Sequence, residues 1–467
     1  MTDVVLCQVP YWEVYGKVKG VSFLDPPLNL CYLAAVLEKN GIDVEIIDSE
    51  AEELNKDETI EKILSINPKI VGFACTTPMI GSVKYCAEKL KEKNKDIKIV
   101  LGGPHITAMW ENVIKLPYVD FCIRGEGEYP LLKLVQSVLK NDKNNIRHIN
   151  NIVHKDFVNP VAPLVENLDE LPFPARHLLK NIQKYKNATI GKKAGLSQTI
   201  ISSRGCPMMC IFCSAHVTFG RRVRYRNPIK VVDEIEECVD KFKSQNIAFV
   251  DDTLTLNKEH ITKMCNEIIR RGLNEKMEWF CQARVDTIDK EMLMLMKKSG
   301  CYSIQYGIES GSQRVLNILK KGFTLEQVEK AIKMTKEVGI HIHGYFILGS
   351  PTETKDEIEQ TIKWAKHLSL DTVQFTLLTP FPGTESYEMY LKSTPTPEDF
   401  NNFRVHENVF FYSKELPPEE ILRLRRKAYK EFYLRPKYIM KRLLEINSFD
   451  SIKKSINNVK ILINMVK

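Results

Sequence analysis

The chain of 467 residues contains no apolar run that approaches the roughly 18 residues needed to span a bilayer. It also has no basic start of the signal-peptide type, because Met1-Thr2-Asp3 leads straight into a strand pattern. These absences argue against an integral membrane protein and predict a cytoplasmic one. The content of 43% hydrophobic and 27% charged residues is typical of globular proteins, and the length predicts two or three domains.

Most of the cysteines lie far from one another in the sequence. Nine of the twelve cysteines stand singly on predicted helices and strands, where reduced thiols act as small buried hydrophobic groups. This usage argues against a secreted, disulfide-stabilised protein and favours a reducing compartment.

The other three cysteines, Cys206, Cys210 and Cys213, form a C-x3-C-x2-C motif on one loop. A cubane iron–sulfur cluster normally takes four cysteines, so three would leave one iron free to bind a ligand that is not protein. Two alternatives are a set of structural thiols and a zinc site completed by His216. Zinc sites usually show paired C-x2-C or Cys/His spacings, which favours the cluster.

With Phe212 just before the last cysteine, the motif resembles the signature of the radical S-adenosylmethionine (SAM) superfamily. The resemblance implies a 4Fe-4S cluster whose open iron chelates the amino and carboxylate groups of SAM. An electron from the cluster then cleaves SAM to a 5′-deoxyadenosyl radical. The resemblance places Phe212 beside the adenine and makes a protein such as ferredoxin or flavodoxin the expected electron donor.

The first 140 residues alternate short apolar runs with helical stretches, which predicts a parallel sheet covered by helices on both faces. Ligands of such sheets bind at the carboxyl ends of the strands. The residues expected there are Cys75, Thr76, Thr77, Gly102, Gly103, His105, Gly125 and Glu126. Glycines at two of the three strand ends would let a large flat ligand approach the backbone, although Gly102-Gly103 taken alone favours an ordinary turn.

Together these segments resemble the cobalamin-binding domain of B12-dependent radical SAM enzymes. The resemblance rests on residues 23–28 with 32–35, on residues 102–107 and on residues 120–128. It implies a Rossmann-like domain over residues 1–140 that binds cobalamin. The Asp-x-His-x-x-Gly motif of other B12-binding proteins is missing, so the sequence marks no histidine as a lower ligand of cobalt. The alternative is a domain that binds no cobalamin.

Residues 141–193 are expected to form a turn-rich connector, and six further strand–helix units follow over residues 194–395. Six units rather than eight predict a partial (β/α)6 TIM-type barrel, as in radical SAM enzymes, with its active site at the strand carboxyl ends. Residues 396–467 are expected to form a helical C-terminal region. The expected fold class is therefore α/β.

Candidate SAM-binding residues follow three of these strands. By the resemblance, Asp251 and Asp252 lie beside the methionine moiety of SAM. Glu309 and Ser310 correspond to a segment that contacts the ribose, and a loop containing Gly349 and Ser350 lines the adenine. Carboxylates suit these positions because they accept hydrogen bonds from ammonium and hydroxyl groups. Taken singly, Glu309 could equally cap the helix that follows it.

Four arginines, Arg221, Arg222, Arg224 and Arg226, follow the cysteine loop. They predict either a solvated basic face or a bidentate contact with the SAM carboxylate or an anionic substrate.

The best-supported function is a cobalamin-dependent radical SAM enzyme that methylates an unactivated carbon of a small-molecule or lipid-like substrate, using SAM and methylcobalamin. One alternative is a radical SAM cyclase or rearranging enzyme that acts on a lipid or tetrapyrrole-like substrate. A methylthiotransferase is disfavoured because the cysteines of the first 140 residues lie far apart. A non-catalytic corrinoid-binding module is the last alternative, and the intact three-cysteine motif argues against it.

Basic charge is concentrated in the tail. Residues 421–467 hold 13 Lys and Arg against 3 Asp and Glu. The formal net charge of the whole chain is +8, so the preceding residues together are close to neutral. No nucleic-acid partner is therefore expected. The tail pattern predicts an amphipathic basic helix broken at Pro436. Such a helix either packs on the barrel with a solvated basic face or makes a peripheral contact with anionic lipid headgroups.

Overall fold

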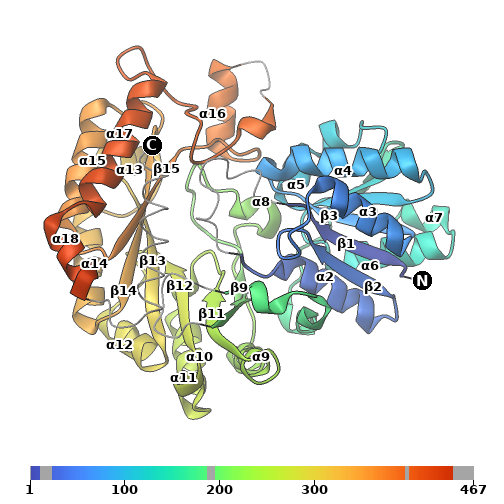
Figure 1. Ribbon diagram of the computed structural model, residues 1–467, viewed down its shortest axis with the longest axis horizontal. Coiled ribbons are helices and arrows are strands. Elements are labelled where there is room, and N and C mark those ends of the chain that lie inside the picture. Colours follow the sequence, from blue (N-terminus) through green and yellow to red (C-terminus); the bar gives the residue numbers. More distant parts are fainter. Residues whose placement is uncertain (1, 11–23, 187–194, 395–398, 445–467) are drawn as a thin grey trace.

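The computed structural model describes residues 2–10, 24–186, 195–394 and 399–444. They form two α/β halves, and each half is built on its own β-sheet (Figure 1). Within these ranges no helix combines the length and the apolar character needed to cross a membrane.

The first sheet has seven strands in the order β2-β1-β3-β4-β5-β6-β7. The first five of these run parallel, and the last two pair antiparallel at the edge. The strands are β1 (Val4–Gln8), β2 (Val44–Asp48), β3 (Ile70–Ala74), β4 (Lys98–Gly102), β5 (Phe121–Ile123), β6 (Ile152–His154) and β7 (Phe157–Val158). The parallel part agrees with the predicted Rossmann-like sheet. The short strands β6 and β7, with the short helix α7 (Lys143–Ile146), come from the segment expected to be connector.

Helices cover both faces of this sheet because its central strands are apolar on both sides. Two helices, α2 (Leu28–Lys39) and α6 (Glu128–Leu139), pack on one face, and their buried side chains form one core with the sheet. The other face carries α3 (Lys56–Ile66), α4 (Ile80–Lys93) and α5 (Pro104–Val113). The carboxyl ends of the strands are left for loops that can bind a ligand.

The second sheet has six parallel strands in the order β15-β14-β13-β12-β11-β8. In the part of the chain that is described, its two edge strands do not pair with each other, so the barrel stays open, as predicted from six units. The strands are β8 (Leu196–Ile200), β11 (Ser244–Phe249), β12 (Glu278–Ala283), β13 (Cys301–Glu309), β14 (His341–Leu348) and β15 (Thr372–Leu377).

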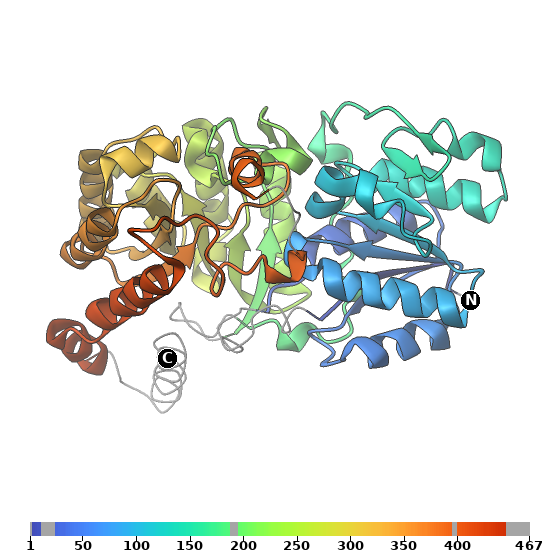
Figure 2. The same cartoon turned by 90° about the horizontal axis from the view of Figure 1, so that it is seen from above.

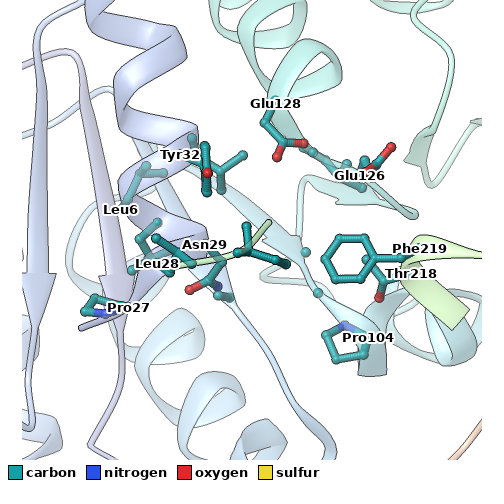
Figure 3. A pocket seen from close by; sticks show the side chains of 18 of the residues that line it. Leu6, Pro27, Leu28, Asn29, Tyr32, Pro104, Glu126, Glu128, Thr218 and Phe219 are labelled. Atoms are coloured by element: carbon teal, nitrogen blue, oxygen red, sulfur yellow. The ribbon is translucent and has the colours of Figure 1, made fainter. Parts of the chain in front are cut away.

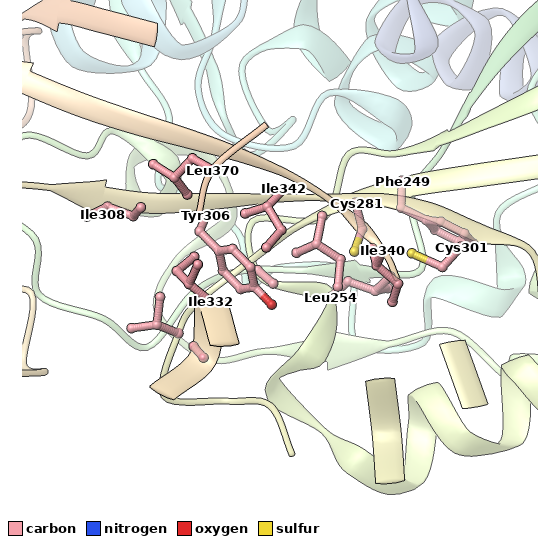
Figure 4. Packing of buried hydrophobic residues seen from close by; sticks show 14 of the residues in the cluster. Phe249, Leu254, Cys281, Cys301, Tyr306, Ile308, Ile332, Ile340, Ile342 and Leu370 are labelled. Carbon is pink, nitrogen blue, oxygen red and sulfur yellow. The ribbon is translucent and has the colours of Figure 1, made fainter. Parts of the chain in front are cut away.

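The main core of this half lies between the sheet and its outer helices (Figure 4). Tyr306, Ile308 and Ile342 point into that core. Because side chains alternate along a strand, Gln305 and His343 lie on the opposite, inner face. The outer helices are α9 (Pro228–Asp240), α10 (Lys258–Arg270), α12 (Lys290–Lys298), α14 (Leu325–Val338), α15 (Lys355–His367) and α17 (Pro418–Tyr433).

The C-terminal elements lie mainly on the second half (Figure 2). Helix α17 packs on edge strand β15: Tyr429 and Phe432 are buried, and the Tyr429 hydroxyl accepts a hydrogen bond from the Phe375 backbone N–H at 2.9 Å. Helix α18 (Pro436–Leu444) begins at Pro436, which confirms the predicted break. The structure thus gives α17 the packed role expected of a covering helix. The basic residues from 445 onward lie outside the described residues.

Candidate active site between the two sheets

A cavity of about 580 Å³ lies between the two halves, a size usual for small-molecule and cofactor sites. We call it the intersheet cavity. Its first-half wall is largely apolar, and Leu6, Leu28, Tyr32 and Pro104 are among the side chains that Figure 3 shows around it. The second half contributes Thr199, Ile201, Arg204, Ser214, Ala215, Thr218, Phe219, Val250 and Asp252. The carboxyl ends of strands from both sheets therefore meet at one space.

Two adjacent glycines at the end of β4 have different roles. Gly102 lines the cavity, and a Cβ atom there would meet only the Ile123 Cβ at 4.0 Å. Gly103 has a φ of +101°, and a Cβ atom there would lie 2.8 Å from the Cys75 carbonyl oxygen. Glycine is thus required at Gly103 by a neighbouring loop, whereas a side chain at Gly102 would project toward the ligand space.

Four of the predicted residues do not line the cavity: Cys75, Thr76, Thr77 and His105. The Nδ1 atom of His105 lies 3.1 Å from the Thr77 hydroxyl, and its ring meets Phe400 edge-on at 4.9 Å. Burial lowers the pKa of His105 to about 3, so the imidazole is neutral. These residues join the loops after β3 and β4 to the 3-10 turn η7 (Phe400–Asn402).

Gly125 and Glu126 do line the cavity. The backbone N–H of Gly125 donates to the Thr107 hydroxyl at 2.9 Å, which fixes the loop after β5. The Glu126 carboxylate, however, is engaged by protein groups: it accepts from Arg204 at 2.8 Å and from the Val165 backbone N–H at 2.7 Å. It lies in the cavity wall as part of an ion-pair network rather than as a free ligand group.

The three cysteines lie on the loop between β9 (Ser203–Arg204) and α8 (Ala215–Phe219), and all three are half-buried. Gly205 shapes this loop, because at its φ of +97° a Cβ atom would lie 2.4 Å from the Arg222 carbonyl oxygen. Burial raises the pKa of Cys213 to about 11, and the nearby Asp252 and the other two thiols act in the same direction.

The three thiols supply the donor set of a cubane cluster. Within the described ranges, no three or more His, Cys, Asp or Glu side chains gather closely enough to hold one metal ion. In a cubane cluster each cysteine binds a different iron, so the three sulfurs stand farther apart than the ligands of one ion. The donor set and its half-buried position fit the group that the motif predicts.

The cysteine loop packs against the barrel ends through a small apolar cluster. Ile211 is buried there among Val315, Leu319 and Ile347, and Phe212 packs against them. The Ile211 backbone N–H donates to the Leu319 carbonyl at 3.3 Å. Phe212 therefore lies between the cysteines and the segment that follows β13.

The two aspartates after β11 point in different directions. Asp251 is buried and accepts hydrogen bonds from the Ser202 and Ser203 hydroxyls at 2.7 and 2.6 Å, so it holds the backbone that leads into the cysteine loop. Asp252 reaches the intersheet cavity. Burial, reinforced by Asp251, raises the pKa of Asp252 to about 6. Only Asp252 is placed to meet a ligand.

Glu309 ends β13 and forms a buried ion pair with Lys321 at 2.9 Å. The Lys321 ammonium also lies 5.7 Å from the centroid of the Phe212 ring. Arg284 donates to the Lys321 carbonyl at 2.7 Å, and its Nη1 is buried without a hydrogen-bond partner among the described residues. Sequence reasoning missed Lys321 and Arg284: Arg284 follows the end of β12 directly, whereas nothing in the local sequence marks Lys321, which lies beyond α13 (Gln313–Ile318).

The remaining barrel candidates are partly internal. Ser310 is fully buried and its hydroxyl lies 3.1 Å from that of Thr361, so it packs behind the strand end. Gly349 adopts a φ of +74° directly after β14. The Ser350 hydroxyl and Glu353 Oε1 are buried without partners among the described residues, and burial raises the pKa of Glu353 to about 8. These orphaned polar atoms suit the edge of a site that binds a polar cofactor.

Three of the four arginines after the cysteines pair with acidic side chains, so these three form neither a uniformly solvated face nor a free anion site. Arg224 and Arg226 are buried and pair with Glu126 and Glu234 at 2.8 and 2.6 Å. Arg222 is exposed and pairs with Glu166. The sequence pattern could not reveal this division because the acidic partners lie far away along the chain.

The inner face of the second sheet carries a polar row across four strands. Gln282, Gln305, His343 and Thr372 are successive partners in the register of β12 to β15. His343 Nδ1 lies 2.8 Å from the Thr372 hydroxyl, while its buried Nε2 has no hydrogen-bond partner among the described residues. Burial lowers the pKa of His343 to about 3, so this row is uncharged.

Comparisons with known proteins agree with this geometry. Residues 200–365 match the radical SAM superfamily, and residues 20–135 match the B12-binding domain. The chain is 36% identical over 459 residues to an uncharacterized methyltransferase of Pyrococcus horikoshii, covering 96% of this chain and 95% of that protein. The chain therefore belongs to the radical SAM superfamily, in the group whose members also carry a B12-binding domain.

Two further similarities concern the sequence and the fold. An anaerobic magnesium-protoporphyrin IX monomethyl ester cyclase of Rubrivivax gelatinosus is 33% identical over 373 residues, which span 78% of this chain and 66% of the cyclase. The structure of the cobalamin-dependent SAM radical enzyme OxsB with aqua-cobalamin bound has a TM-score of 0.77 at 18% identity, covering 100% of this chain and 72% of OxsB. That similarity shows the shared fold.

Proposed function

We propose that this protein is a cobalamin-dependent radical SAM methyltransferase. The observation that carries the proposal is the junction itself: Ser214 and helix α8, which directly follow the cysteine loop, contribute Ser214, Ala215, Thr218 and Phe219 to the wall of the cavity at the first-sheet loops. Bound there, the cluster and SAM would supply a substrate radical and the cobalamin would supply the methyl group.

The chain's own residues would position these groups. Cys206, Cys210 and Cys213 would bind the cluster, and Phe212 would pack beside SAM. The Glu309–Lys321 pair, Arg284 and Asp252 would offer charged groups to the zwitterionic part and the hydroxyls of SAM. The apolar first-half wall, with Gly102 open toward it, would hold the corrin by shape and water exclusion.

We infer that the substrate is a small molecule that reaches the inner face of the second sheet. The neutral polar row of Gln282, Gln305, His343 and Thr372 would meet hydrogen-bonding groups on that molecule, because unpaired polar groups buried against hydrocarbon are costly. A reduced ferredoxin or flavodoxin would deliver the electron.

Anaerobic reconstitution tests the proposal directly. Purified protein is loaded with iron, sulfide and hydroxocobalamin, desalted, and incubated with SAM and a reductant. Retained corrinoid spectra together with both 5′-deoxyadenosine and S-adenosylhomocysteine are expected, since methylation uses one SAM in each way. Absence of both nucleosides from iron-loaded protein would contradict the proposal.

A cyclase is the second candidate, and the similarity to the Rubrivivax gelatinosus enzyme favours it. The methyltransferase and the cyclase would differ in one product. A cyclase that uses no methyl group would form 5′-deoxyadenosine without S-adenosylhomocysteine. Incubation with cell extract and isotope-labelled SAM, followed by mass spectrometry, would then show whether the product has gained CH2, because a methyl group replaces a hydrogen, or has formed without a carbon from SAM.

A contact with acidic lipid surfaces is a further proposal for the C-terminal region. Leu434, Ile439, Met440 and Leu444 are exposed around α18, and Lys437 is exposed beside them. Apolar and basic groups together suit binding to anionic headgroups. Salt-sensitive cosedimentation of the full chain with phosphatidylserine vesicles is expected. Equal binding by a chain ending at residue 433 would leave the region a structural role only.

A further inference from the structure

Four buried charged side chains connect the two halves at the edge of the intersheet cavity. Arg204 binds Glu126 through Nη1 at 2.8 Å and Glu128 through Nη2 at 2.6 Å. Arg224 binds the other oxygen of Glu126 at 2.8 Å. None of the four side chains is more than 7% exposed. We call this group the cross-sheet network.

The network lies between the two predicted cofactor sites. Glu126 and Glu128 belong to the loop after β5 and the start of α6, in the first half. Arg204 belongs to β9 and is separated from Cys206 by one glycine. Figure 3 shows both glutamates beside the cavity, with Tyr32 and Phe219 nearby. A displacement of the first-half loop would therefore be transmitted directly to the cysteine loop.

The geometry of Arg204 leaves it little freedom. Its guanidinium carbon lies 5.3 Å from the centroid of the Tyr32 ring and 5.2 Å from that of Phe219. A planar guanidinium that contacts two carboxylates and two rings has a fixed orientation, which a lysine ammonium could not reproduce. Arg204 therefore acts as a rigid connection rather than as a mobile surface charge.

A second buried ion pair lies beside the hairpin formed by the antiparallel strands β9 and β10 (Arg224–Tyr225). Arg226 follows β10 and binds Glu234 of α9 at 2.6 Å. It also donates to the Tyr32 hydroxyl at 3.1 Å. Tyr32 on α2 is thus touched by Arg204 and by Arg226. The β9–β10 hairpin, which flanks the cysteine loop, is consequently fixed to the first half at two points.

We propose that the cross-sheet network is a positioning device that fixes the cysteine loop relative to the cobalamin side of the cavity, with Arg204 and Glu128 as its central pair. The proposal rests on the proposed function for the identity of the two cofactors, and on this chain's own contacts for the coupling. Its consequence is a fixed separation between the cluster and cobalt.

Amide hydrogen exchange on the protein without cofactors tests the coupling. Glu128→Gln removes one negative charge in the first half, so Arg204 and Arg224 must share the Glu126 carboxylate and the buried network carries one unbalanced positive charge. We expect exchange at residues 203–206 and 219–226, in the other half, to rise by at least about tenfold. Glu166→Gln is the matched control, because Glu166 forms an exposed ion pair with Arg222, which follows the cysteine loop. The control is expected to leave those amides unchanged.

Equal exchange in Glu128→Gln, Glu166→Gln and wild-type protein would overturn the proposal. Should Glu128→Gln fail to fold, Glu128→Asp keeps the charge and shortens its reach, and the same amides are compared. A rise confined to α6, without a change near the cysteines, would also overturn it.

Electron paramagnetic resonance of loaded protein tests the consequence. Dipolar coupling between a reduced cluster and cobalt(II) falls with the cube of their separation. We expect wild-type and Glu166→Gln protein to show one narrow distribution of this coupling. In Glu128→Gln we expect the coupling to be weaker or its distribution to be broader. An unchanged coupling in Glu128→Gln would contradict the positioning role. Wild-type protein that retained no cluster or corrinoid would instead contradict the proposed function, while the exchange result would still decide the coupling.

Discussion

The carboxyl ends of the two sheets provide different environments although both come from parallel α/β architecture. At the first sheet the cavity wall is largely apolar, and Gly102 brings backbone close to the ligand space. At the second sheet the strand ends carry buried charged groups, namely Glu309 with Lys321 and Arg284 beside them. The first end is suited to a large ligand recognised by shape, and the second to a smaller charged one recognised by hydrogen bonds.

The difference also separates structural from ligand-facing polar residues. At the first sheet, His105 and Thr77 bond to each other away from the cavity. At the second, Asp251 bonds to Ser202 and Ser203, whereas its neighbour Asp252 reaches the cavity. A polar residue at a strand end is therefore as often a support for the loop as a contact for the ligand.

The largest expected effect comes from the cysteine loop. Replacing Cys206, Cys210 and Cys213 with alanine should abolish iron binding and 5′-deoxyadenosine formation, because the other described cysteines are buried elsewhere. Iron analysis and nucleoside chromatography on anaerobic protein measure both. Cys238→Ala, a buried thiol on α9, serves as the control and should retain iron. Nucleoside formation by the triple variant at the wild-type level would refute the assignment.

The two glycines after β4 sharpen the contrast at the first sheet. Gly102→Trp should block corrinoid binding with little change in stability, because its side chain would enter the cavity. Gly103→Ala should lower the free energy of unfolding by about 1–3 kcal/mol, since it combines a positive φ with a clash against Cys75. Corrinoid absorbance that remains after desalting measures ligand binding. Urea unfolding measures stability, so the two experiments separate the two effects. Corrinoid retention by Gly102→Trp would show that the ligand lies elsewhere.

Two adjacent lysines offer the corresponding test at the second sheet. Lys321→Met should lower the free energy of unfolding by about 3–5 kcal/mol, because it leaves the Glu309 carboxylate buried without its cation. It should also weaken SAM binding. Lys320→Met removes an exposed pair with Glu385 and should cost about 0–1 kcal/mol. Denaturant unfolding measures the loss of stability, and calorimetric titration measures the loss of SAM affinity. Equal losses in the Lys321 and Lys320 variants would contradict the role given to the buried Glu309–Lys321 pair.

The smallest expected effect is a pH dependence of the folding stability that comes from Glu353. Burial raises the pKa of Glu353 from 4.5 to about 8, so the folded state keeps a proton that the unfolded state loses. This contribution to stability is fully present below pH 4.5 and declines as the pH rises through about 8. Glu353→Gln, which is neutral at every pH, should therefore gain stability relative to wild type between pH 5 and pH 9. A difference in melting temperature between Glu353→Gln and wild type that stays the same at all these pH values would contradict the prediction.

Much of the fold could be predicted because hydrophobic periodicity is local. The strands 4–8, 44–48, 98–102, 278–283 and 341–348 coincide with apolar runs bounded by turn residues. β6 and β7 were missed because two or three residues carry too little periodicity, and only pairing with β5 and with each other makes them strands. The cluster motif was equally local, since its three cysteines lie on one short loop.

The sequence by itself determined the parallel sheets, the three-cysteine loop and the glycines at the first strand ends, because each depends on neighbours within a few residues. Only the tertiary structure decided which polar groups face the cavity. Arg204 meets Glu126 and Glu128, and Arg226 meets Glu234, across long stretches of chain. A buried charge requires a partner of opposite sign, but which partner it finds depends on how two separately folded sheets pack together.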